Sequence, residues 1–181
     1  YHFRVTHQNG DQVNRIDPFA RFVRQGDPGE HPLEADGKPW YAVIQKSKAY
    51  QWNVKNFVAR KNEDILQVFP STLIEDTPWP NWKEVARHIV QNYKETHNSI
   101  LLEQVFHHNL HASMGFLPGS LFSPNYRFGT PEDLKWAIDH LHKHGFSVKL
   151  DFPFHPSRDW DTGIAGLSGG EELYLKDHYH P

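Results

Sequence analysis

The alternation of apolar strand-like runs with amphipathic helix-like runs between residues 65 and 152 constrains the fold more than any other feature. The runs read as a strand at 65–73, a helix at 82–96, a strand at 99–106, a helix at 131–144 and a strand at 146–152. Strands connected by helices must pair in parallel, with right-handed crossovers. The order therefore predicts an α/β fold, which begins either a doubly wound sheet or a (β/α)8 barrel.

Both predicted helices carry clear start signals. Asn81 and Glu84 have the spacing of a capping box, in which each side chain satisfies a free backbone N–H. Thr130 is a typical N-cap residue, and Pro131 suits the first helical position. Gly145 follows the second helix, where glycine commonly ends one. These signals fix where the two helices begin.

The first forty residues have a different character. Residues 1–24 read as short strands, and Asn9-Gly10 is a strong hairpin-turn signal between two alternating runs. Residues 25–39 are rich in Gly, Pro and Asp and read as a surface loop, and the run WYAVIQ that follows predicts a strand. This part of the chain is therefore expected to be β-rich.

Composition excludes several functional classes. A formal net charge of −3 in 181 residues gives no basic surface for nucleic acid. No apolar run approaches the roughly 18 residues that a membrane span requires. Without cysteine there is neither a disulfide framework nor a thiolate site, so we expect an intracellular protein rather than a secreted one. Both ends read as if cut from a longer chain.

Fourteen histidines raise the question of a metal site. Zinc favours three or four ligands in a tetrahedral arrangement, which neither histidine cluster offers at a suitable spacing. One cluster is His107, His108 and His111 on a predicted loop, and the other is His140, His142 and His144 on a predicted helix. We interpret both clusters as exposed histidines and predict no metal and no cofactor. The acid pairs Glu171-Glu172 and Asp159-Asp161 are interpreted as solvated loop residues.

The run YRFGTPEDLKWAIDHLHKHGFSVKLD, which begins at Tyr126, resembles the segment leading into the third barrel strand of α-glucan branching enzymes of glycoside hydrolase family 13. HHNLHASMGF is similar to the loop after the second strand, and YHFRVTHQNGDQVNRIDPFARFV to the end of the amino-terminal β-module. The resemblance implies a partial (β/α)8 (TIM-like) barrel of about three β/α units at 61–181. A small β-sandwich remnant, resembling the end of a carbohydrate-binding module, would precede it at 1–60.

The same resemblance identifies three vestigial positions of the substrate site. Phe116 stands where the family has a tyrosine that stacks under the sugar, and Asp151 and His155 stand for an aspartate and a histidine after the third strand. His155 follows Asp151 one residue earlier than in the family, and such a slip turns a side chain to the other face of an extended chain. The family's catalytic carboxylates lie on the fourth and fifth strands, so no catalytic residue is predicted here.

The altered positions lead to two functional hypotheses and a third, weaker one. The first is a non-catalytic, degenerate branching-enzyme-like chain that acts as a structural subunit, with a protein partner covering its open half-barrel. The alternative is the amino-terminal fragment of an active 1,4-α-glucan branching enzyme of glycogen or starch biosynthesis. The third is a sugar-binding module, with Trp40 and Trp52 as candidates for stacking on α-glucan, although tryptophan more often packs in a core.

Overall fold

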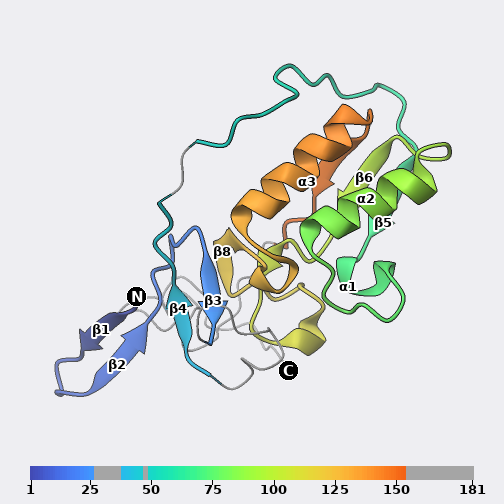
Figure 1. Ribbon diagram of the computed structural model, residues 1–181. Helices are drawn as coiled ribbons and strands as arrows, with labels where there is room; N and C mark the ends of the chain where they lie inside the picture. Colours follow the sequence, from blue (N-terminus) through green and yellow to red (C-terminus); the bar gives the residue numbers. More distant parts are fainter. Residues whose placement is uncertain (27–37, 47–48, 154–181) are drawn as a thin grey trace. The chain divides into compact units, whose positions relative to one another are not determined.

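The computed structural model describes residues 1–26, 38–46 and 49–153 (Figure 1). These residues fall into two compact units. The described part of the first unit comprises residues 1–26, 38–44, 106–123 and Pro153, and that of the second comprises 45–46, 49–105 and 124–152. Each unit is described by itself below.

The first unit opens with the predicted hairpin. Strands β1 (Phe3–Thr6) and β2 (Gln12–Arg15) pair in antiparallel fashion, with Val5 opposite Val13. Gly10 lies in the turn at a φ of +90°, a conformation that glycine adopts without a steric penalty. The hairpin expected from Asn9-Gly10 is therefore confirmed.

Two further strand pairs complete the first unit. Strand β3 (Val23–Gln25) pairs antiparallel with β4 (Trp40–Ala42), and β7 (Phe106–His107) pairs with β8 (Ser120–Pro124), whose last residue belongs to the second unit. A short 3₁₀ helix, η1 (His111–Ser113), lies between β7 and β8. A small apolar core is formed by Ile16, Ala20, Val23 and Ala42, with Trp40 packed against it.

The second unit is an α/β unit built around a parallel sheet. Its strands are β5 (Ile65–Val68), β6 (Ser99–Leu102) and β9 (Ser147–Leu150), in that order. Helices α2 (Trp82–Tyr93) and α3 (Pro131–Lys143) connect them and pack side by side (Figure 1). The predicted alternation of strands and helices with parallel pairing is confirmed.

Two predicted strands were too long. The run 65–73 forms strand only as far as Val68, because Pro70 opens a short helix, α1 (Pro70–Leu73), at a position where proline costs no hydrogen bond. The run 99–106 is interrupted after Leu102, because Gln104 adopts a φ of +56°, which is incompatible with a continuing strand. Apolar residues on both sides of this kink had suggested one element.

Helices α2 and α3 begin beside each other at a shared carboxylate. The capping boxes of Asn81 and of Thr130 are both formed, and Asp133 in the first turn of α3 also binds Lys83 at 2.6 Å. Asn81 Nδ2 lies 3.4 Å from Asp133 Oδ2. Gly129, which ends the 3₁₀ helix η2 (Tyr126–Phe128), has a φ of +117°, and a Cβ atom there would also lie 2.5 Å from Asn81 Nδ2, so glycine is strongly favoured.

The core of the second unit lies where the two helices cover the sheet. Its fully or nearly fully buried apolar residues come from strands, helices, the η2 turn and the residues that flank the strands: Val68, Trp82, Val85, Ala86, Ile89, Ile100, Leu102, Val105, Phe128, Ala137, Leu141 and Phe146. Burial of this set is the main stabilising term for the unit. Across the described ranges, no helix has both the length and the apolar character needed to cross a bilayer.

Candidate functional site

Polar side chains gather at the carboxyl ends of the parallel strands, which is where barrel enzymes place their chemistry. Glu103 follows β6 directly and is 4% exposed, and Asp151 follows β9 directly. The exposed Gln67 of β5 donates from Nε2 to Glu103 Oε1 at 2.7 Å. Three neighbouring strands thus contribute one polar group each to a connected set.

The two carboxyl groups of this set influence each other. Burial raises the pKa of Glu103 above its ordinary value of 4.5, and the hydrogen bond from Gln67 opposes that shift. A hydrogen bond with Asp151 and the charge of that carboxylate raise the Glu103 pKa further. Glu103 is therefore easier to protonate than an exposed glutamate, as expected for paired acids in a poorly solvated position.

The structure places Asp151 at the predicted strand end, and its backbone N–H donates to the carbonyl oxygen of Leu102 at 2.9 Å. Phe116 lies in the first unit, on the loop after η1, and its side chain is 51% exposed. His155 lies outside the described residues. The roles assigned to these three positions by resemblance remain predictions.

The two candidate stacking tryptophans have different surroundings. Trp40 is partly buried against the small core of the first unit, and its ring centroid lies 4.4 Å from that of His107 in an edge-on contact. Trp52 belongs to the second unit, is 39% exposed, and contacts the ring of Tyr50 at 4.8 Å. Trp52 has the larger free surface and is the better candidate for sugar contact.

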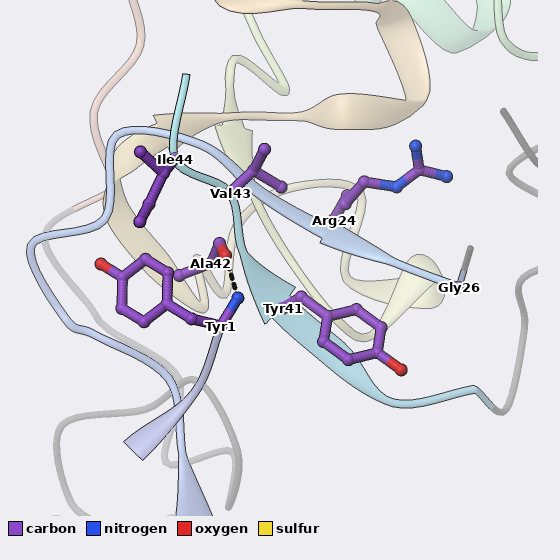
Figure 2. Close-up of a pocket in the computed structure, with 7 residues that line it drawn as sticks. All are labelled: Tyr1, Arg24, Gly26, Tyr41, Ala42, Val43 and Ile44. Atoms are coloured by element: carbon purple, nitrogen blue, oxygen red, sulfur yellow. Dashed lines mark hydrogen bonds between the residues drawn. The ribbon is translucent and has the colours of Figure 1, made fainter. Parts of the chain in front are cut away.

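The first unit contains a pocket of about 480 Å³ beside β3 and β4 (Figure 2). Two tyrosine rings and a guanidinium group give it aromatic and cationic character, and the backbone nitrogen of Tyr1 donates to the carbonyl oxygen of Ala42 at 2.6 Å. None of its lining residues is an acid, so it offers no pair for acid–base chemistry. The lining comprises Tyr1, Arg24, Gly26, Tyr41, Ala42, Val43 and Ile44.

The prediction that the histidine clusters are exposed is confirmed only for His111, because His140, His142 and His144 are half-buried and the other two are buried completely. His107 and His108 are fully buried, because β7 and the residue after it lie inside the first unit. The Nε2 atom of His107 lies 2.7 Å from Asn109 Oδ1, and Nδ1 of His108 lies 3.2 Å from the Phe106 carbonyl oxygen. In the part of the chain that the structure describes, no three His, Cys, Asp or Glu side chains are grouped so as to hold a metal ion.

The acid pairs Glu171-Glu172 and Asp159-Asp161 lie outside the described residues. Sequence reasoning missed Glu103 and Gln67, because Gln67 is a single polar residue within an apolar run and Glu103 belongs to a short Glu-Gln pair within another. A usable signal was present, since Glu103 is an acid at the end of a strand expected to be covered on both faces. Only the register of three strands shows that Glu103 faces Gln67 and Asp151.

Comparisons with known proteins find similar sequences along the whole chain. No protein-family model matches the sequence. The chain is 30% identical over its whole length to the 1,4-alpha-glucan branching enzyme of Cutibacterium acnes, of which it covers 27%. It is 28% identical, again over its whole length, to the 1,4-alpha-glucan branching enzyme of Marinobacter nauticus, of which it covers 28%.

A solved structure shows the fold. The crystal structure of a candidate alpha amylase from Salmonella typhimurium matches 99% of this chain and 28% of its own, with a TM-score of 0.69 and 17% identity. The chain thus spans little more than a quarter of the length of the relatives it matches. We conclude that it is a relative of the 1,4-α-glucan branching enzymes, with an amylase-like fold.

Proposed function

We propose that the chain forms the early part of an α-glucan-processing enzyme and contributes the first β/α units of its barrel. The proposal corresponds to the amino-terminal fragment of a 1,4-α-glucan branching enzyme. The observation that carries it is the similarity to branching enzymes along the whole chain. The three parallel strands support it, because their carboxyl ends present Gln67, Glu103 and Asp151 on the edge that barrel enzymes use for catalysis.

In this proposal the second unit supports the barrel and lines part of the substrate-binding site. The retaining mechanism of such enzymes requires a nucleophilic carboxylate and a separate acid about 5–5.5 Å apart. By resemblance, those two groups belong to the fourth and fifth strands, so Asp151 would contact or order the site without being a nucleophile. We further propose that about three β/α units lie at 61–181 and that residues 1–60 are the remnant of a β-sandwich.

A branching assay on the full-length gene product tests the proposal. Incubation with amylose should lower the iodine-staining absorbance and create α-1,6 branch points that isoamylase releases as short chains. Asp151→Asn should lower the activity, whereas Glu95→Gln, at an exposed position on the second unit, should leave it unchanged. Failure of a folded full-length protein to branch amylose would overturn the proposal.

A non-catalytic structural subunit is the second candidate. It is favoured by Phe116, whose ring carries no hydroxyl at a position where the family is expected to have a tyrosine. This reading requires a protein partner that covers the free edges of the sheet, since unpaired strand edges promote association. A full-length protein that is inactive on amylose but purifies in a stoichiometric complex would support it, and a monodisperse active monomer would contradict it.

The proposed glucan contact at Trp52 has its own test. Aromatic faces stack on sugar rings, and the Trp52 ring is sufficiently exposed to do so. Trp52→Ala should weaken retention on an amylose affinity gel, whereas Trp40→Phe should act mainly through the stability of the first unit. Equal retention of Trp52→Ala and the wild type would exclude Trp52 from glucan binding.

A further inference from the structure

The strand register brings Glu103 and Asp151 to equivalent positions on adjacent strands. Leu102 of β6 lies opposite Leu150 of β9, so the two acids are the next residues along each chain. The backbone N–H of Asp151 donates to the Leu102 carbonyl oxygen at 2.9 Å, and that of Glu103 donates to the Val68 carbonyl oxygen at 2.9 Å. Backbone bonds therefore continue past both strand ends and hold the two carboxyl groups near each other.

Within residues 1–26, 38–46 and 49–153, no cation is paired with either acid, and Lys149, two residues before Asp151, is bound to Glu63 instead. Gln67 on β5 donates a neutral amide hydrogen to Glu103, and Asp151, directly after β9, is the acidic neighbour. On the turn after β6, Gln104 is neutral, and its Oε1 accepts from the backbone N–H and the hydroxyl of Ser71 at 3.2 and 2.8 Å. Among the described residues, no Lys, Arg or His contributes to the shift in the Glu103 pKa. Two adjacent carboxylates without a cation repel, and a shared proton removes the repulsion.

We propose that Glu103 and Asp151 share one proton and that Glu103 thereby positions the carboxyl group of Asp151 at the end of β9. In the shared state one carboxyl O–H donates to a carboxylate oxygen of the other residue, and the pair carries a single negative charge. No heavy-atom bond changes, and the proton is exchanged with solvent. Glu103 is a positioning residue in this scheme, because it acts through Asp151.

This inference stands apart from the proposed function. It depends on the register and the hydrogen bonds of the second unit, and it holds whether or not the full-length protein branches glucan. An inactive protein that still shows the shared proton would overturn the function and leave the pair intact. An active protein without the shared proton would overturn the pair and leave the proposed function intact.

The sign of the pH effect follows from the direction of the shift. The pKa of Glu103 is raised in the folded protein above the ordinary value of 4.5, so the folded state binds more protons than the unfolded state between these two values. The stabilisation is fully present below about 4.5 and is lost as the pH rises through the folded pKa. Within that window one extra proton changes the unfolding equilibrium constant by up to about tenfold per pH unit.

The experiment measures urea unfolding of the full-length protein at several pH values for the wild type and two Glu103 variants. Glu103→Gln reproduces the protonated acid, because its amide can accept from Gln67 and donate to Asp151. Its stability relative to the wild type should increase as the pH rises above 4.5 and then level off. Glu103→Leu has a similar volume but lacks both hydrogen bonds, so it should be less stable than Glu103→Gln at every pH.

The partner and a neutral control complete the test. Asp151→Asn should remove the charge that raises the Glu103 pKa and so reduce the pH dependence, whereas Glu95→Gln should leave it as in the wild type. Parallel stability curves for wild type and Glu103→Gln would overturn the proposal, as would an unchanged curve for Asp151→Asn. If the variants do not fold, carboxyl ¹³C NMR of labelled wild type decides, because Glu103 must then titrate above 4.5 and a value at or below it overturns the pair.

Discussion

Glu103 at the end of β6 and Asp139 on α3 are both buried carboxyl groups of the second unit, 4% and 2% exposed, but their pKa values shift in opposite directions. Burial alone would raise both. At Asp139, hydrogen bonds from the backbone N–H groups of Val54 and Asn53 outweigh burial and lower the pKa. Glu103 has one amide donor and a second acid beside it. Burial is the largest influence at both groups, and the number of hydrogen-bond donors decides whether it is outweighed.

The difference also separates the structural roles of the two groups. Asp139 accepts from the Asn53 and Val54 N–H groups at 3.0 Å each, from Asn53 Nδ2 at 2.6 Å and from the Tyr50 hydroxyl at 3.2 Å. It fixes the segment before β5 to α3, and the ring of Phe57 stacks on His142 at 4.1 Å farther along. A fully satisfied ion serves as an anchor, whereas a partly satisfied acid pair remains able to exchange a proton.

Replacing Asp139 should give the largest effect. Asp139→Ala leaves two backbone N–H groups and an amide without their acceptor, and each such loss costs about 1–3 kcal/mol. We expect the free energy of unfolding at pH 7 to fall by roughly 3 kcal/mol, with greater protease sensitivity of residues 49–57. Urea unfolding measures this against Glu95→Gln, and a loss below about 1 kcal/mol would mean that water replaces the carboxylate.

The second largest effect should appear in the pH dependence of the unfolding free energy, which should distinguish Asp139 from Glu103 at acidic pH. The pKa of Asp139 is lowered below its ordinary value of 3.8, so its stabilisation is present above 3.8 and is lost as the pH falls through the folded pKa. Asp139→Asn should therefore flatten the loss of stability on the acid side, while Glu103→Gln changes the curve above 4.5. A single common pH window for both variants would refute the contrast between them.

Asp133 should show an intermediate effect. Burial would raise its pKa, but Lys83 and Thr130 outweigh burial and lower it. Asp133→Asn loses the ion pair with Lys83 and weakens the bonds from the Thr130 backbone and hydroxyl, which are 2.9 and 2.8 Å long. We expect a loss of about 1 kcal/mol in unfolding free energy, typical of a cap. Lys83→Met, which removes only the ion pair, should lose less, and an equal loss would assign the effect to charge alone.

The smallest effect is expected at the ion pair between Glu63, which precedes β5, and Lys149 of β9. The hydrogen bond from Lys149 lowers the Glu63 pKa, but the pair is open to solvent. Glu63→Gln should lower the urea midpoint slightly at low ionic strength and not at about 1 M salt, where charges are screened within about 3 Å. A salt-independent loss would indicate that the contact between Glu63 and Ser99 matters more than the charge.

Local signals were sufficient to predict much of the fold. Asn9-Gly10 specifies its hairpin, and the residues at 81, 84, 130 and 131 specify the starts of α2 and α3, because caps and turns depend on a few adjacent residues. The strand ends were misjudged where distant partners decide. Leu102 ends β6 because Glu103 and Gln104 bind groups more than thirty residues away in the sequence.

The candidate site was predictable only in part. Asp151 stands at the end of an obvious strand, so its position follows from the pattern of apolar residues. Its partner Glu103 lies with Gln104 between the apolar residues Leu102 and Val105 and reads as part of a core run. Pairing between them depends on which strand lies next to which and in what register, and a single sequence does not contain that information.

Because Gly129 has no side chain, Asn81 and Asp133 can approach each other, and this contact links the two helices. Since the first turns of α2 and α3 use one set of atoms at Asn81 and Asp133, neither helix can slide along its axis without unmaking the other's start. The two helices of this unit should therefore move together as one rigid body. Movement within this unit should therefore be concentrated in the turns that follow the strands.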